Sequence, residues 1–429
     1  MKVEVAYGKQ MQKCAICNES YVKVISPRKG EPLLNIKAAI ESAIHNPIGS
    51  PPLTKLVQPH HKVVIMVDDI TRPTPTSILI EPILNVLEEI GVPDKNILIV
   101  FALGVHRKMD KAEMVKVLGT EIFNRYDCLN HEAFIDSELV DLGFTEFGTP
   151  LFVNRKVFEA DIRILTGVIK PHNLAGYSGG AKAILPGVCG VKTIMYNHNF
   201  KTQSHPYSRL GLLGKNPLRK DIDEVIKKMG NTFIVNLILD YKENICKIVA
   251  GDCIKAHKEG ARFLDTIAKR YVSEEADICI CGTPSPMDNT VYQMCNSFVV
   301  PFRSPRPIIK KEGIIICLGE ALEGISDGDM YEVIVNSSSI EELYKEIKNL
   351  DCEIHERAGV QHICELLINY KFFIVSNIKN KRKIENMGIR YFKTLQEAFD
   401  EAIRIKGEKA SVFILPYAPF VIPELIEKK

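Results

Sequence analysis

The sequence predicts two α/β domains with parallel-type sheets and a site in the cleft between them. Continuous apolar runs, typical of strands buried on both faces, alternate with helical segments along the 429 residues. A modest change in composition at Tyr271–Ala276 separates two such series. We therefore expect an N-terminal domain over residues 1–270 and a smaller C-terminal α/β domain over residues 271–429.

The first half repeats one pattern, in which a buried strand ends in a polar tip and a helix follows. The strand Lys62–Val67 ends where Pro73 and Pro75 forbid its continuation, and Thr76 or Ser77 can cap a helix that runs to Ile90. The other predicted elements of this half are a helix over 35–45, strands over 96–101 and 162–168, a helix over 110–118, a helix capped by Asn216, a strand over 232–239, a short strand or turn before 250 and a helix over 255–269.

The second half restarts the same alternation without an internal repeat of the first. Its predicted strands are 278–281, 314–318, 372–376 and 411–415, and its predicted helices are 340–350, 360–370 and 394–404. The polar tips of the first half have no counterpart here, apart from the segment 288–293 after the first of these strands.

Three successive strand tips carry titratable or anion-binding side chains. Asp69 and Arg72 follow the first strand, His106 the second and His172 the third. Because ligands bind at the carboxyl ends of strands in open α/β sheets, we expect these groups to converge. Arg72 offers a planar fork for a carboxylate or phosphate. Each residue also has an ordinary interpretation, as a hydrogen-bonded loop histidine, a surface ion pair or a helix-capping aspartate.

The segment after the third strand is rich in glycine and in reactive side chains. It places His172, Lys182 and His198 among Gly176, Gly179, Gly180, Gly187 and Gly190. Glycine lets the backbone lie close to a ligand, and lysine and histidine supply nucleophilic, titratable or metal-binding groups. The sequence GYSGGAKA lacks the GK[ST] ending and the spacing of a P-loop, which argues against an ATPase.

Composition excludes several classes of protein. A formal net charge of +2 with interspersed signs is unlike a nucleic-acid-binding surface. No signal peptide and no apolar run of membrane-spanning length is visible, so we expect a cytoplasmic protein with no membrane partner. Cysteines within apolar strands indicate reduced thiols. The pair Cys14 and Cys17 lacks a second pair at zinc-site distance and is interpreted as structural.

Two histidines at one sheet edge are what a two-base racemase needs, with one acid or base for each face of a carbon. His198 is a candidate metal ligand, although a lone histidine is a weak signal and no HxH or HExxH accompanies it. The remaining metal ligands would then have to come from a cofactor.

Taken together, these motifs resemble the nickel-dependent lactate racemase family. The matching segments are DDITRPTP at 68–75, ALGVHRKM at 102–109, TGVIKPHNLAGYSGGAKAILPG at 166–187, Asn-His at 197–198 and Tyr-Gln at 292–293. The resemblance covers essentially the whole chain and is looser in the second domain. It implies an isomerase, a racemase or epimerase of a small 2-hydroxy acid, with the active site in the cleft and the cofactor in the N-terminal domain.

The resemblance also implies roles for residues. Lys182 would be joined through a thioamide to a nickel-pincer pyridinium mononucleotide, and His198 would be the protein ligand of nickel. His106 and His172 would move the substrate hydroxyl proton while the α-hydride goes to the cofactor, so the proton differs from that of a two-base racemase. Asp69 and Arg72 would line the cofactor and substrate site, and Arg72 would join Tyr292, Gln293 and Asn296 in binding substrate.

One departure from the family pattern concerns the substrate. Asn296 stands where the lactate-active pattern has a lysine three positions after the glutamine, so a charged contact becomes neutral. The chain also contains no tryptophan for the aromatic wall of that pattern. We therefore expect a 2-hydroxy acid other than simple lactate, larger or polyhydroxylated. Cofactor-synthesis and maturation proteins are the implied partners, and a homo-oligomer is compatible with the sequence.

Two other functions stay open from the sequence alone. A nicotinamide-dependent hydroxyacid dehydrogenase would share the α/β fold and a His/Arg site, but no GxGxxG follows a strand. A non-catalytic homologue that binds the cofactor or ligand is the alternative outside enzymes, and the presence of both His106 and His172 argues against it.

Overall fold

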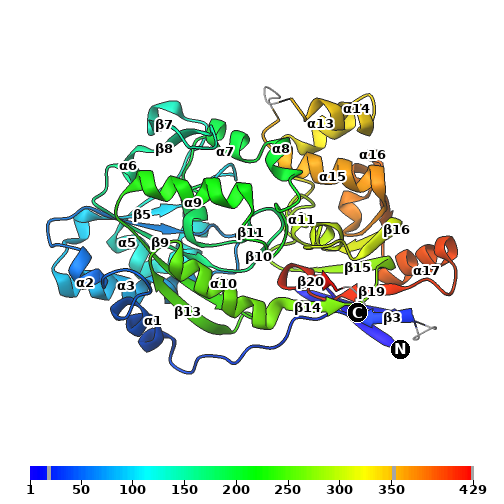
Figure 1. The fold of residues 1–429 in the computed structure, drawn as a ribbon, viewed down its shortest axis with the longest axis horizontal. Coiled ribbons are helices and arrows are strands. Elements are labelled where there is room, and N and C mark those ends of the chain that lie inside the picture. Colours follow the sequence, from blue (N-terminus) through cyan, green and yellow to red (C-terminus); the bar gives the residue numbers. More distant parts are fainter. Residues whose placement is uncertain (17–20, 350–353, 427–429) are drawn as a thin grey trace.

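The computed structural model describes residues 1–16, 21–349 and 354–426 and contains two α/β units side by side (Figure 1). Each unit is a largely parallel sheet covered by helices, as predicted. The predicted helix end at Leu350 and the second cysteine of the Cys14/Cys17 pair lie outside the described residues. Within the described ranges, no helix combines the length and the apolar character that a membrane span requires.

The first sheet has the strand order β13-β12-β9-β4-β5-β6. Its strands are β4 (Val63–Val67), β5 (Ile97–Phe101), β6 (Asp127–Asn130), β9 (Ile162–Val168), β12 (Thr232–Leu239) and β13 (Ile245–Gly251). The pair β12 and β13 is antiparallel, and the other neighbouring pairs are parallel. The adjacent strands β9, β4 and β5 therefore end at one edge, which confirms that their three polar tips meet.

The helices of the first half are α1 (Ile36–His45), α2 (Leu53–Leu56), α3 (Thr76–Ile90), α4 (Lys111–Leu118), α5 (Thr120–Arg125), α6 (Arg155–Phe158), α7 (Val191–Asn197), α8 (Phe200–Gln203), α9 (Pro217–Met229) and α10 (Lys255–Ala268). The Asn216 side chain accepts a hydrogen bond from the Arg219 N–H at 3.1 Å, which confirms the predicted cap of α9. An antiparallel hairpin, β7 (Leu139–Phe144) and β8 (Pro150–Asn154), was not predicted.

The second sheet has the strand order β18-β17-β16-β15-β1-β2, with β19 also beside β15 and β3 beside β19. Its strands are β1 (Lys2–Gly8), β2 (Gln10–Ala15), β3 (Val22–Val24), β15 (Ala276–Pro284), β16 (Ile309–Leu318), β17 (Lys371–Val375), β18 (Arg390–Phe392) and β19 (Val412–Leu415). Its helices are α11 (Cys295–Phe298), α12 (Val300–Arg303), α13 (Met330–Asn336), α14 (Ile340–Glu346), α15 (Arg357–Asn369), α16 (Lys381–Asn386) and α17 (Leu395–Lys406).

Strand pairing at the N-terminus differs from the predicted division at residue 270. β1 pairs in parallel with β15, and β3 pairs in parallel with β19, so these strands belong to the second sheet (Figure 1). A parallel pairing across so many residues leaves no local trace in the sequence. A short parallel pair, β14 (Lys269–Val272) with β20 (Ile422–Leu425), further ties the chain's end to the junction of the two halves.

The two halves share one apolar core. Alternate residues of β4 point to opposite faces, so Ile65 packs with helices α1 to α3 while Met66 faces the other way. The core that contains Met66 continues through Leu185 to Phe298 and Ile363 of the second half. Because apolar packing crosses the junction, the loops at the strand tips are held against the second half.

Candidate active site

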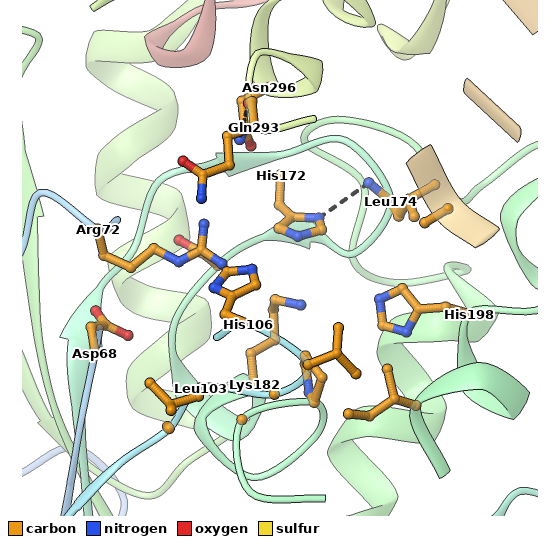
Figure 2. A pocket seen from close by; sticks show the side chains of 18 of the residues that line it. Asp68, Arg72, Leu103, His106, His172, Leu174, Lys182, His198, Gln293 and Asn296 are labelled. Atoms are coloured by element: carbon orange, nitrogen blue, oxygen red, sulfur yellow. Dashed lines mark hydrogen bonds between the residues drawn. The ribbon is translucent and has the colours of Figure 1, made fainter. Parts of the chain in front are cut away.

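The predicted site residues converge in one pocket between the two halves (Figure 2). The tips of β4, β5 and β9 form one wall, and residues around α11 and the start of α15 form the other. The charged and polar lining residues include Asp68, Arg72, His106, Lys170, His172, Lys182 and His198 from the first half and Tyr292, Gln293, Asn296, Arg357 and His362 from the second. Asp69 is not among these lining residues.

Asp69 instead holds the His106 ring. The Nδ1 atom of His106 lies 2.9 Å from Oδ2 of Asp69, a side chain that is only 5% exposed. Burial alone would raise the pKa of the Asp69 carboxyl, but His106 and Arg72 outweigh it and hold that pKa well below its usual range. The other carboxylate oxygen accepts the Thr71 backbone N–H at 2.7 Å. Since a carboxylate only accepts, Nδ1 donates to it and Nε2 keeps a lone pair.

His172 has the opposite hydrogen-bonding pattern. Its Nδ1 atom accepts the backbone N–H groups of Leu174 at 3.2 Å and Ala175 at 3.1 Å, as the dashed line in Figure 2 shows for Leu174. An Nδ1 that accepts carries no proton, so the neutral ring has its N–H at Nε2. Burial and the nearby Lys182 and Lys170 lower the pKa of His172 well below its usual value.

Local backbone geometry explains the glycines of the segment that carries Lys182. Pro171–His172 pairs with Gly176–Tyr177 as a short hairpin, and a Cβ at Gly176 would lie 2.3 Å from the Leu212 carbonyl oxygen. The Gly187 carbonyl accepts the Gly104 N–H at 2.9 Å, which joins this segment to the tip that carries His106. These contacts set the position of the lysine relative to the two histidines.

Lys182 and His198 face the same pocket from this segment (Figure 2). Burial, together with the positive charges of Arg72 and Arg219, lowers the pKa of Lys182 to about 7, so a large share of its amine is uncharged near neutral pH. His198 is the C-cap residue directly after α7, and its Nδ1 atom is buried with no hydrogen-bond partner among the described residues. Burial and Lys182 lower the pKa of His198 to about 3, so its ring is neutral.

The residues of the second half that were expected to bind substrate are neutral and polar. The Tyr292 ring packs against Gly359, where a Cβ would lie 2.6 Å from the ring. Gln293 is 5% exposed, and its Oε1 atom has no hydrogen-bond partner among the described residues. One N–H of the Asn296 amide donates to the Gln293 backbone carbonyl at 2.8 Å, so part of the donor capacity of Asn296 is already used.

Asp68, Lys170 and His362 are among the lining residues that were not predicted. Asp68 precedes the predicted Asp69, and burial raises its pKa although Thr74 Oγ1 donates to it at 2.5 Å. Lys170 stands two positions before His172 in the matched motif, which could have drawn attention to it. His362 of α15 gave no sequence signal, because only folding brings its Nε2 atom within 3.1 Å of the Asn173 amide nitrogen.

The described residues contain no metal site built from protein side chains alone. Within residues 1–16, 21–349 and 354–426, no group of three or more His, Cys, Asp or Glu side chains is arranged to hold a metal ion. His198 is therefore not part of such a group among the described residues.

Comparisons with known proteins agree in fold and in sequence. Residues 7–211 match the model of the lactate racemase N-terminal domain, and residues 272–422 match that of the lactate racemase C-terminal domain. The chain is 30% identical to a lactate racemase of Lactiplantibacillus plantarum over 96% of this chain and 97% of the relative. It is 29% identical to a lactate racemase of Thermoanaerobacterium thermosaccharolyticum over 98% of each chain.

A solved structure supports the same conclusion. The lactate racemase apoprotein from Thermoanaerobacterium thermosaccharolyticum superposes with a TM-score of 0.89 at 28% identity, over 99% of this chain and 100% of that chain. Both domain models and near-complete coverage of the relatives place the whole chain in one family. The protein belongs to the lactate racemase family and is an isomerase of the racemase type.

Proposed function

We propose that the protein is a racemase or epimerase of a 2-hydroxy acid that uses a nickel-pincer nucleotide attached to Lys182, with His198 as the protein ligand of nickel. One observation carries the proposal. Two histidines from different strand tips line the same pocket as a buried lysine and a buried, partly unpartnered histidine, in a member of the lactate racemase family.

The pocket fits such a cofactor. A lysine amine with a pKa of about 7 is partly uncharged near neutral pH and can act as a nucleophile, as covalent attachment requires. The neutral His198 ring has a lone pair to offer a metal, and the attached group would supply the remaining ligands. When bound, the cofactor supplies a reversible acceptor for the α-hydrogen of the substrate together with its bonding electrons.

The two histidines begin in complementary states. His106 has an Nε2 lone pair that can take the substrate hydroxyl proton, and the Asp69 carboxylate stabilises the charged ring that forms. His172 is neutral with its N–H at Nε2, so it can donate a hydrogen bond to the oxygen of the keto form, and the proton that His106 took returns to that oxygen. Loss of the α-hydrogen makes the carbon planar, so hydrogen can return to either face and either stereoisomer results.

The substrate we propose is not simple lactate. Asn296 is neutral, and one of its amide protons already binds the Gln293 carbonyl, so this wall holds a substrate through amide groups rather than a cation. Amide and phenol groups at Asn296, Gln293 and Tyr292 suit a larger or polyhydroxylated 2-hydroxy acid. We further propose that cofactor-synthesis and maturation proteins load the chain.

The deciding experiment is intact mass and metal analysis of protein produced together with cofactor-synthesis enzymes. We expect an added mass on the peptide that contains Lys182 and stoichiometric nickel. Lys182→Ala should lose both, whereas the exposed control Lys192→Ala should keep both. His198→Ala should lose nickel and keep the added mass. An unmodified Lys182 without nickel, in a strain that loads a known family member, would contradict the proposal.

A further inference from the structure

We propose that Lys170 is a substrate-binding residue whose ammonium group, together with the Arg72 guanidinium, binds the carboxylate of the 2-hydroxy acid. This role rests on the proposed function and assigns the charged contact that Asn296 cannot make. It predicts that the carboxylate lies against the first half of the chain, beside the tips of β4 and β9.

Backbone hydrogen bonds hold Lys170 in place, and the residue lines the pocket. Its backbone N–H donates to Ser178 Oγ at 2.9 Å, and its carbonyl accepts the Ser178 N–H at 2.9 Å. The residue is only 5% exposed and lines the pocket with Arg72 and Asn296. A lysine held this way reaches the ligand space without the loss of flexibility that an exposed lysine would suffer on binding.

The Lys170 ammonium lacks a partner in the described residues, where it makes no hydrogen bond and no ion pair. An unpaired buried cation is costly, and burial together with Arg72 lowers the pKa of Lys170 to about 7. Asp68 lies near enough to raise that pKa, but its carboxylate accepts Thr74 Oγ1 instead of forming an ion pair with the lysine. A bound carboxylate would stabilise the protonated form of Lys170 and balance the charge of Arg72 beside it.

The other cationic side chains of the pocket have different assignments. Lys182 is the proposed attachment point of the cofactor. Arg357 begins α15 in the second half, is 2% exposed and has interaction partners within the protein. Lys170 and Arg72 are thus the pair left for the substrate carboxylate, and a charge-assisted hydrogen bond from each would orient the acid towards the two histidines.

The alternative is that Lys170 only supports the fold, and the two roles predict opposite effects on stability. If Lys170 stabilised the fold, Lys170→Met would remove stabilising contacts and lower the thermal midpoint of unfolding. A lysine whose role is ligand binding destabilises the ligand-free fold, so Lys170→Met should raise the midpoint, because it removes a buried amine that has no hydrogen-bond partner among the described residues.

The test uses the full-length chain, with and without cofactor, and glycolate as the probe. Glycolate is an achiral 2-hydroxy acid, so calorimetry reports binding without net conversion. Lys170→Met should weaken glycolate binding by about tenfold to a hundredfold, the usual worth of a hydrogen bond between charged groups. The exposed control Lys192→Met should bind as the unsubstituted chain does. Lys170→Gln provides a second variant, and Lys170→Met with Asn296→Lys should regain part of the affinity.

Each outcome decides the role. Unchanged glycolate affinity in Lys170→Met or Lys170→Gln, or a chain that does not bind glycolate, would overturn the assignment of Lys170. If the loaded chain inverts no 2-hydroxy acid while glycolate binding still depends on Lys170, the proposed function fails and the carboxylate site stands. If racemisation proceeds with an unchanged KM in Lys170→Met, the proposed function stands and the role of Lys170 is refuted.

Discussion

Replacing Asp69 with asparagine tests whether this carboxylate acts through His106 or on the cofactor. The substitution keeps the size of the side chain and removes its charge. Asp69 lies 2.9 Å from His106 Nδ1 and is absent from the pocket lining, so the structure predicts an effect through the histidine and not through contact with the cofactor. The Nε2 lone pair of His106 would become a weaker base, because no carboxylate stabilises the charged ring.

The expected magnitude follows from the kind of contact that is lost. A hydrogen bond to a charged group contributes about 1.5 to 3 kcal/mol, and it is stronger in the charged state of the histidine than in the neutral one. If most of this difference appears in the step in which His106 takes a proton, kcat falls by about tenfold to a hundredfold. The cofactor content should not change.

Polarimetry measures this effect on the loaded enzyme, with one stereoisomer of a 2-hydroxy acid that the unsubstituted enzyme inverts. Intact mass and nickel analysis of the same samples show whether the cofactor is still bound. A normal kcat would refute the idea that Asp69 supports His106. A loss of nickel or of the added mass would show instead that Asp69 contacts the cofactor, as the family resemblance implied.

Two further predictions concern the stability of the cofactor-free chain, measured by urea unfolding. The pKa of Lys182 is about 7 in the fold against an ordinary value of 10.5, so the unfolded chain binds more protons between these values. Stability should therefore rise with pH across this window, by up to about 1.4 kcal/mol per pH unit for such a group, and Lys182→Met should flatten the rise; an equal slope in both proteins would contradict the lowered pKa. Gly187→Ala should cost about 1 to 3 kcal/mol, because its Cβ would lie 2.2 Å from the Ala183 carbonyl oxygen. Gly214→Ala, with nothing within 4 Å of its Cβ, should have little effect, and equal losses in both variants would refute the steric explanation.

Much of the fold was predictable because its signals are local. The strand Ile162–Val168 has the predicted bounds, since a continuous apolar run marks a strand buried on both faces. The cap at Asn216 was predicted because a capping side chain and the helix it serves are adjacent in sequence. The places of His106 and His172 followed from one rule, that the tips of neighbouring parallel strands meet at one edge.

Pairing between distant segments was not predictable in the same way. The strand Lys2–Gly8 joins the sheet of the second half, and the alternation of apolar and polar residues in this strand does not indicate which strand it pairs with. His362 reaches Asn173 only because the second half packs against the strand tips. Likewise, which of two adjacent carboxylates faces the pocket depends on how the chain turns after β4, and the turn places Asp68 in the lining and Asp69 against a histidine.

The sequence by itself therefore determined the α/β class, the bounds of the central strands and the reactive side chains at their tips, because periodicity, caps and glycine positions are properties of short segments. Only the tertiary structure decided burial and partners, which depend on residues far along the chain. Lys170 shows the difference. In the sequence it is a lysine near a histidine of interest, and in the fold it is a buried lysine that lines the pocket beside Arg72 and lacks an ion-pair partner in the described part of the chain.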